Sequence, residues 1–226
     1  MNTGANLRKI NNFGIANTIF MFKVYFENRA IIICGEDDNF PEDANAVILR
    51  LNGNKDFRET VRLFENGNGL ERLYIPAKEP EKLFNRFRKE FSEIDAGGGL
   101  VENKRGDYLM IYRNGLWDLP KGKREKGEKR KATALREVRE ETGLKEISPG
   151  ELICVTHHCY RWKGQGELIM KHTYWYRMTY TAPIELIPQT EEDITKATWI
   201  AKSTLPSFLT NTYPSITEVF REAGII

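Results

Sequence analysis

Three glutamates, Glu137, Glu140 and Glu141, lie within a segment of helix-forming residues that runs from Lys129 to Thr142. Residues three and four apart share one face of an α-helix, so the sequence predicts three neighbouring carboxylates. Carboxylates this close repel one another at neutral pH unless a cation neutralises them. Hard oxygen ligands at this density suit Mg²⁺ or Mn²⁺, cations that also bind phosphate oxygens. The competing interpretation is a solvated acidic helix face, tied by ion pairs to neighbouring arginines and lysines.

A basic loop containing two glycines precedes this helix. Gly122 and Gly127 allow the backbone to approach a ligand closely or to adopt positive φ. Cations crowd the loop and the first helical turn: Lys121, Lys123, Arg124, Lys126, Lys129, Arg130 and Lys131. A helix start disfavours cations unless an anion is bound, because its exposed N–H groups already carry partial positive charge. We therefore expect the first four to bind substrate phosphates, with a merely solubilising basic face as the alternative.

Local interactions should fix the loop and the helix in place. Glu128 and Arg136 lie on opposite sides of the helix start, and we expect a structural ion pair between them. Gly143 stands where a left-handed cap ends a helix. The apolar stripe that seats the helix on a core consists of Ala134, Leu135 and Val138.

These residues form one continuous motif. Gly122 is followed after five residues by Glu128, and after seven more by Arg-Glu-Val-Arg-Glu-Glu-Thr-Gly-Leu, residues 136–144. The pattern resembles the motif of the Nudix hydrolases at every fixed position, and the resemblance extends over roughly Gly99 to Ile226. It implies a mixed β-sheet sandwiched between helices, in which the motif forms a loop–helix–loop.

The resemblance also implies roles for individual carboxylates. Glu137, Glu140 and Glu141 become the ligands of a Mg²⁺ or Mn²⁺ cofactor. The resemblance also implies that a carboxylate activates the attacking water. This carboxylate is either one of the three, for which we select Glu137 and Glu140 as candidates, or one from a later loop. Glu192 is our candidate for that later carboxylate, beside Glu191 in a segment that would otherwise be a polar, solvent-facing turn.

Two further segments bear on the substrate. Trp117–Gly122 (WDLPKG) and Lys171–Tyr176 (KHTYWY) resemble Nudix members that act on dinucleoside polyphosphates or diphosphoinositol polyphosphates. The expected function is hydrolysis of a phosphoanhydride bond in such a molecule or in a nucleoside diphosphate derivative, with Lys171 as another substrate-binding residue. The alternatives are a ligand-sensing Nudix-like regulator without strong catalysis and an interaction module. The intact carboxylate set argues against both.

Strands must support the motif. The sequence predicts a strand pair at 99–103 and 107–112, a strand with its following loop at 154–162, and later strands at 171–176 and 197–200. His157 and His158 fall on one of these strands. A half-buried structural histidine is the favoured interpretation there, and a general acid or base is the alternative.

The first half has a different pattern and resembles no family. It predicts a hairpin of strands 22–26 and 30–34, a strand at 46–51 closed by Asn52-Gly53-Asn54, and a helix at 56–65. A strand at 70–75 stopped by Pro76 and a helix from Pro80 to Phe91 complete a β-β-β-α-β-α order. This small α+β unit could be a lid over the site, a homodimer surface or a passive extension.

The domain boundary is placed at the glycine run Ala96–Gly99, read as the most flexible stretch of the chain. The expected organisation is a flexible lead-in at 1–20, a small α+β domain at 21–95 and a Nudix hydrolase domain at 96–226.

Composition limits the remaining classes. The 226 residues are 40% hydrophobic and 29% charged, with a net charge of only +2, so no stable nucleic-acid partner is expected. Three cysteines without CxxC spacing indicate a reducing compartment. No apolar run approaches the roughly 18 residues that span a membrane, and residues 1–20 lack the pattern of a secretory signal, with Met21 a candidate start. We therefore expect a cytoplasmic protein whose partner is a small phosphorylated molecule.

Overall fold

The computed structural model describes residues 21–40, 44–51, 57–162, 166–182 and 186–226. The expected lead-in at 1–20 and the turn at 52–54 lie outside the described residues. The chain divides into two compact units. The first comprises the chain up to Glu93 together with His157–Lys171, and the second comprises Ile94–Thr156 and His172–Ile226. That a later segment returns to the first unit was not predicted from the sequence.

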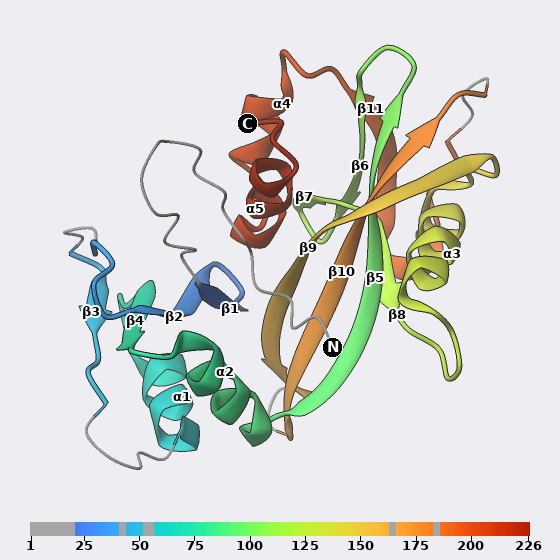
Figure 1. Ribbon diagram of the computed structural model, residues 1–226. Coiled ribbons are helices and arrows are strands. Elements are labelled where there is room, and N and C mark those ends of the chain that lie inside the picture. The colour runs from blue at the N-terminus through green and yellow to red at the C-terminus, as the bar shows by residue number, and fades with distance from the viewer. Residues whose placement is uncertain (1–20, 41–43, 52–56, 163–165, 183–185) are drawn as a thin grey trace. The chain divides into compact units, whose positions relative to one another are not determined.

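The first unit contains the predicted order of elements (Figure 1). Its strands are β1 (Phe22–Phe26), β2 (Arg29–Gly35), β3 (Ala46–Ile48) and β4 (Arg72–Ala77), arranged in the order β1-β2-β4-β3. Its helices are α1 (Phe57–Asn66), α2 (Pro80–Phe87) and the short 3-10 helix η1 (Arg88–Glu90). The hairpin of β1 and β2 is antiparallel, whereas β4 pairs in parallel with β2 and β3.

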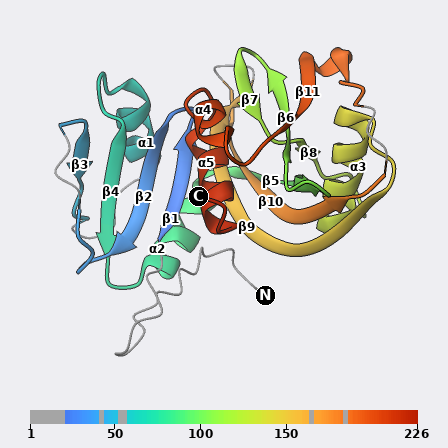
Figure 2. The ribbon, with the colours of Figure 1, turned by 90° about the horizontal axis from the view of Figure 1, so that it is seen from above.

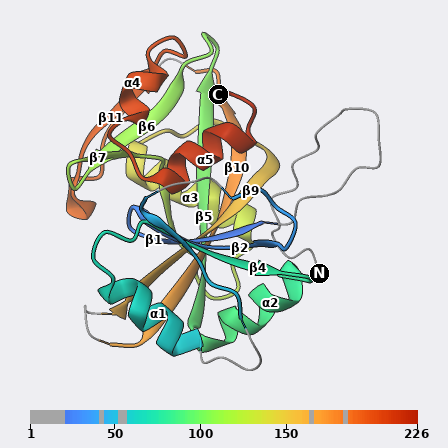
Figure 3. The same cartoon turned by 90° about the vertical axis from the view of Figure 1, so that its left-hand side faces the viewer.

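Side-chain alternation along the strands builds the core of the first unit. One face, covered by α1 and α2 (Figure 3), buries an aromatic-rich cluster. It includes Phe22, Val24, Ile31, Ile33 and Ile75 of the strands and Phe57, Val61, Phe64, Phe84 and Phe87 of the helices. The opposite face buries a smaller cluster with Tyr25, Ile32 and Tyr74.

Three predicted boundaries in this unit were wrong. Pro76 does not stop the fourth strand, which continues to Ala77. The last residue of β3, Ile48, pairs with Tyr74, so Pro76 lies beyond the end of β3. The N–H that proline lacks therefore interrupts no pairing between β4 and β3. The helix beginning at Pro80 ends at Phe87, and Phe91 follows η1 instead of belonging to the helix. The third strand ends at Ile48, not Leu51.

The second unit is a mixed sheet between helices (Figure 1), as the resemblance implied. Its strands are β5 (Ser92–Asn103), β6 (Tyr108–Arg113), β7 (Leu116–Asp118), β8 (Lys121–Lys123), β9 (Ile147–Arg161), β10 (Leu168–Tyr180) and β11 (Ile194–Ile200). The end of β9 and the start of β10, within His157–Lys171, belong to the first unit. The order is β11-β6-β5-β10-β9, with β7 paired to β6 and β8 to β5. One face carries α3 (Arg130–Thr142), and the other carries α4 (Leu205–Leu209) and α5 (Pro214–Glu222) (Figure 2).

Alternating residues of the central strands supply both faces of this sheet. Leu100 and Met110 pack in a cluster with the buried residues of α5, among them Phe220. Their neighbours Val101 and Leu109 pack on the opposite face with Ala134 and Val138, which belong to the predicted apolar stripe of α3. Leu144, which follows the helix, packs in the same cluster. The motif helix is therefore seated by a continuous apolar layer.

The glycine run 97–99 is not a flexible linker, because it lies inside β5 and is buried. A Cβ on Gly97 would lie 2.6 Å from the backbone nitrogen of Ala134, and one on Gly99 would lie 2.6 Å from Cγ2 of Val138. A Cβ on Gly98 would overlap the indole of Trp175. The run allows α3 and β10 to approach the strand, so it reflects close packing and not flexibility.

All three cysteines are buried free thiols. Within the described ranges, no helix combines the length and the apolar character needed to cross a membrane.

Candidate active site

The loop and helix of the motif form as predicted. α3 begins at Arg130 and ends at Thr142, and Gly143 adopts the left-handed conformation with φ of 76°. The N–H of Ile187 donates to the carbonyl of Thr142 at 2.9 Å, and a Cβ on Gly143 would lie 2.9 Å from Cβ of Ile187. The glycine cap therefore brings the segment that leads to Glu192 against the end of the motif helix.

Gly122 leaves room for a carboxylate. β8 pairs with β5 so that Gly122 lies opposite Gly97, and a Cβ on Gly122 would overlap the carboxylate of Glu137. Glu137 is 6% exposed. Burial raises the pKa of Glu137, the neighbouring Arg136 lowers it, and the charges of Glu140 and Glu192 raise it further. Glu137 thus lies within the electrostatic influence of two other predicted carboxylates, Glu140 and Glu192.

Glu137 and Glu140 converge on a single cation. Nη1 of Arg136 lies 2.7 Å from Oε1 of Glu137 and 2.8 Å from Oε2 of Glu140. The side chain of Glu140 is 48% exposed, so it combines this contact with access to solvent. Two carboxylate oxygens that hold one positive nitrogen between them define a place where a cation is stabilised.

Glu141 faces the interior. Its side chain is fully buried, and it accepts a hydrogen bond at 2.8 Å from the backbone N–H of Lys121. Nη1 of Arg113 lies 3.3 Å from its Oε1. Burial raises the pKa of Glu141 to about 7, although the charges of Lys121 and Arg113 oppose the rise. Of the three motif glutamates, Glu141 has the environment that most disfavours an uncompensated charge.

Arg113 was not singled out from the sequence, yet it joins the site together. Besides Glu141, its guanidinium lies 3.5 Å from Oε2 of Glu192 and 4.0 Å from Oδ2 of Asp118. Arg113 lies opposite Ile194 in the β6–β11 ladder, which places it beside η3 (Thr190–Glu192). Glu192, predicted as a later-loop carboxylate, is therefore brought to the motif. The only sequence signal for Arg113 was a charge at the end of an apolar strand.

The predicted substrate-binding cations differ in their surroundings. The ammonium of Lys121 lies 2.5 Å from Oδ2 of Asp118, with only 12% of the side chain exposed. Arg124 and Arg130 both contact Asp95, at 3.3 and 3.1 Å, and Arg130 also lies 3.9 Å above the ring of Tyr174. Lys123 and Lys126 are exposed, and neither has an ion pair within the described part of the chain. The two lysines are thus the loop cations most available to a ligand.

The ion pair expected between Glu128 and Arg136 is present. Nε of Arg136 lies 3.0 Å from Oε1 of Glu128, and Nη2 donates to Oε2 at 3.1 Å and to the carbonyl of Lys123 at 3.1 Å. Thr133 donates a further hydrogen bond to Glu128 at 2.8 Å. Arg136, followed by Thr133, holds the pKa of Glu128 down to about 2. Arg136 therefore links the loop, the helix start and two motif carboxylates.

Glu128→Gln is expected to reduce the free energy of unfolding by about 2 kcal/mol at neutral pH, because an amide cannot make the charged hydrogen bonds to Arg136. The depressed pKa of Glu128 stabilises the folded state above the unfolded pKa near 4.5, and this contribution is lost as the pH falls toward about 2. Urea unfolding at pH 7 and near pH 3 should show that the difference in unfolding free energy between wild type and Glu128→Gln is smaller at the lower pH. Glu125→Gln, an exposed loop neighbour, is the control, and a difference independent of pH would contradict the assignment.

A family model described as the NUDIX domain matches residues 94–222. The chain belongs to the Nudix family. The match begins at the residue where the second compact unit begins.

Several solved structures are similar to this chain. The MutT protein of Methanosarcina mazei Go1 is 20% identical, with 58% of this chain and 93% of that chain covered at a TM-score of 0.44. An Ap4A hydrolase of C. elegans in a binary complex is 19% identical, with 58% and 95% covered and a TM-score of 0.46. A NUDIX hydrolase from Nitrosomonas europaea is 18% identical, with 59% and 89% covered and a TM-score of 0.45. Membership of the family rests on the family model and not on these likenesses.

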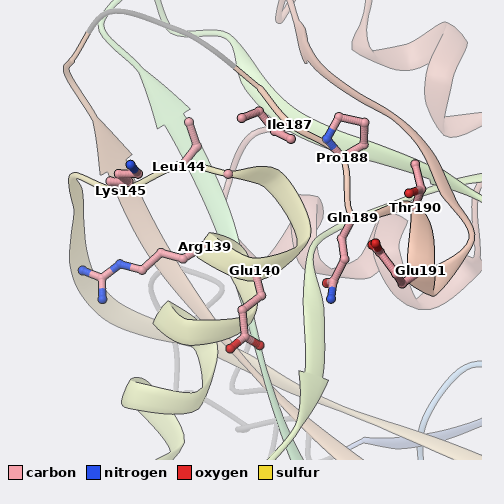
Figure 4. A pocket seen from close by; sticks show the side chains of 10 residues that line it. Arg139, Glu140, Leu144, Lys145, Ile187, Pro188, Gln189, Thr190 and Glu191 are labelled. Atoms are coloured by element: carbon pink, nitrogen blue, oxygen red, sulfur yellow. The ribbon is translucent and has the colours of Figure 1, made fainter.

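The second compact unit, called the Nudix unit from here on, has an open cavity of about 850 Å³ at the C-terminal end of α3 (Figure 4). Arg139 and Glu140 of α3 form one side, and the segment from Ile187 to Glu191 forms the other. Leu144, Ile187 and Pro188 add apolar surface. Glu140 thus lies at the edge of a space with both apolar and charged walls, of the size that small-molecule sites have.

The donor set of the Nudix motif fits a hard divalent cation. Glu137 and Glu140 already hold a cationic nitrogen between their oxygens, and Glu192 acts on Glu137 through its charge. Carboxylate oxygens are the ligands that Mg²⁺ and Mn²⁺ prefer. No group of three or more acidic, histidine or cysteine side chains is gathered in a metal-binding arrangement within the described ranges. Arg113 contacts Glu141, and Arg136 contacts Glu137 and Glu140. A metal would therefore have to replace part of the Arg136 contact.

Three residues considered from the sequence lie in the segment 157–171, which the family model covers but which belongs to the first compact unit. They are Lys171, predicted to bind substrate, His157 and His158. His157 is 5% exposed and its ring centroid lies 4.9 Å from that of Phe84. This environment favours the structural interpretation of His157 over that of a general acid or base.

Proposed function

We propose that this Nudix protein hydrolyses a phosphoanhydride bond, in a reaction that depends on Mg²⁺ or Mn²⁺. The proposed substrate is a dinucleoside polyphosphate, a diphosphoinositol-type molecule or a nucleoside diphosphate derivative. One observation carries the proposal: Glu137 and Glu140 converge on a single cation beside Gly122, and Glu192 adds its charge from a distant part of the chain. A structural acidic face would not require a carboxylate from a second segment.

In this proposal Glu137, Glu140 and Glu141 hold the metal. When bound, the metal neutralises phosphate oxygens and lowers the pKa of a coordinated water. Glu192, Glu137 or Glu140 accepts the proton that the water loses on attack. Arg113 restrains Glu192 through the 3.5 Å contact, so it is a positioning residue. The cavity beside Glu140 receives part of the substrate's organic group.

The exposed lysines of the motif loop support a substrate with several phosphates. Lys123→Glu with Lys126→Glu is expected to raise KM for a polyphosphate substrate by about tenfold or more and to change kcat little, because these lysines bind ground and transition states alike. The increase in KM should be smaller for ADP-ribose, which carries only two phosphates, and it should weaken as the salt concentration rises. Steady-state kinetics on both substrates across salt concentrations measure this.

Lys104→Glu with Lys202→Glu is the matched control, since it changes the net charge equally at exposed positions away from the motif loop. If the control raises KM as much as the loop variant does, general electrostatics explains the effect. If both substrates suffer equally from the loop variant, the preference for polyphosphates is wrong.

A substrate panel tests the reaction itself. Purified protein is incubated with Mg²⁺ and nucleoside diphosphate derivatives, dinucleoside polyphosphates or inositol pyrophosphates, and phosphate-containing products are separated and quantified. Turnover of at least one class that stops with excess chelator and returns with added Mg²⁺ is expected. Binding of a panel member without any turnover would point instead to a ligand-sensing regulator.

A further inference from the structure

The first unit contains a second concave site, formed by residues outside the Nudix motif. A cavity of about 540 Å³ opens where α1, the η1–β5 junction and the described residues at the end of β9 and the start of β10 meet. The ends of these two strands lie beside α1 in Figure 3. Its charged lining residues are Arg58, Arg62, Lys89, Glu90, Arg161 and Glu167. Four cations from three separate segments thus line one hollow, against the two carboxylates of Glu90 and Glu167.

Two of these cations are held in place by carboxylates. Arg161 makes a two-pronged contact with Oε2 of Glu65, at 2.7 Å from Nη2 and 3.2 Å from Nε. Nε of Arg58 lies 2.8 Å from Oε2 of Glu90. These pairs fix the direction of both guanidinium groups, and Nη1 of Arg161 also donates to the carbonyl of Gly166 at 3.4 Å. A guanidinium carries five N–H donors, so these contacts leave Arg161 with donors for a ligand.

The other two cations have weaker compensation. Arg62 approaches Glu59 only to 4.0 Å, and both side chains are more than 60% exposed. Lys89 is exposed, and no carboxylate pairs with it within the described ranges. Ion pairs at exposed positions contribute little to stability, so these two side chains can turn to a ligand at small cost.

Convergent cations on a concave wall raise the local potential and attract anions. Guanidinium groups match phosphate oxygens in a fork-like geometry, and lysine adds a mobile point charge. Leu168 and Phe91 give the cavity an apolar part, and its volume is that of a small-molecule site, larger than a lone phosphate needs. The ligand that fits is therefore an organic molecule with a phosphoryl group.

We propose that this cavity of the first unit binds a phosphorylated small molecule, through Arg58, Arg62, Lys89 and Arg161. The site is separate from the Nudix motif, since the described residues that line it all belong to the first unit. It gives residues 21–93 a binding role of their own, where the sequence pattern left only a lid, a dimer surface or a passive extension.

Binding is tested in the presence of EDTA with inorganic phosphate and AMP as probes. Protein labelled with ¹⁵N-arginine is titrated, and the Nε–H resonances of Arg58, Arg62 and Arg161 are assigned by single Arg→Lys substitutions. AMP is expected to shift these resonances more strongly than phosphate. Arg62→Ala with Lys89→Ala should weaken AMP binding at the remaining two resonances by at least about tenfold.

Lys78→Ala with Lys82→Ala is the control, because it removes two exposed lysines of the same unit that do not line the cavity. AMP should bind this control as tightly as it binds wild type. Unmoved pocket resonances, or equal affinity in the Arg62/Lys89 variant and wild type, would overturn the proposal. No turnover is measured, so neither result depends on the proposed hydrolase activity.

Discussion

Glu140→Gln is expected to lower kcat by at least about a hundredfold, the lower range for losing a general base or an electrostatic stabiliser. Glu140 shares the cationic nitrogen of Arg136 with Glu137, and 48% of its side chain is exposed. Replacing a half-exposed carboxylate with an amide of the same size should leave the core packing intact. The variant should therefore keep its melting temperature within a few degrees of wild type while it loses turnover.

The measurement is steady-state kcat at saturating Mg²⁺, on whichever member of the substrate panel wild type turns over fastest. Glu146→Gln is the matched control, an exposed glutamate just beyond the motif helix. It should retain wild-type kcat. Turnover close to wild type in Glu140→Gln, or full activity of wild type in excess chelator, would exclude the proposed mechanism.

Local spacing was enough to predict the central part of the candidate site. The motif helix, its left-handed cap at Gly143 and the Glu128–Arg136 ion pair all depend on residues within about two helical turns of one another, and all three are present. The hairpin and both helices of the first unit are also present, although α2 ends at Phe87 and not at Phe91. In each case hydrophobic periodicity and capping act between near neighbours in the chain, so the sequence records them directly.

Features that depend on distant contacts were missed or misjudged. Arg113 meets Glu192 across 79 residues, because β6 and β11 are neighbours in the sheet. The β9–β10 hairpin serves both compact units, although its sequence reads as ordinary strands. No periodicity encodes which strands become neighbours, so these relations required the structure. Composition likewise cannot distinguish a glycine in a flexible linker from a glycine that allows another element to pack closely against the backbone.

The glycine run of β5 provides the second large expected effect. Gly97→Ala should reduce the free energy of unfolding of the Nudix unit by about 3 kcal/mol, at the upper end of what overpacking costs. Its new Cβ would lie 2.6 Å from the nitrogen of Ala134 and 2.8 Å from the carbonyl oxygen of Arg130. Both are backbone atoms of α3, so no side-chain rotation can relieve the overlap and the helix must move away from the strand.

That movement should also reduce activity, because α3 carries the three motif glutamates and misplacement by about 1 Å can cost a hundredfold in rate. Gly35→Ala is the control: the three atoms nearest its Cβ would all belong to the side chain of Asp38, the closest at 3.2 Å, and a side chain can shift where a helix backbone cannot. Urea unfolding and kcat are compared for both variants. If Gly97→Ala unfolds and turns over like Gly35→Ala, the close approach of α3 to β5 does not position the carboxylates, and the glycine run has another explanation.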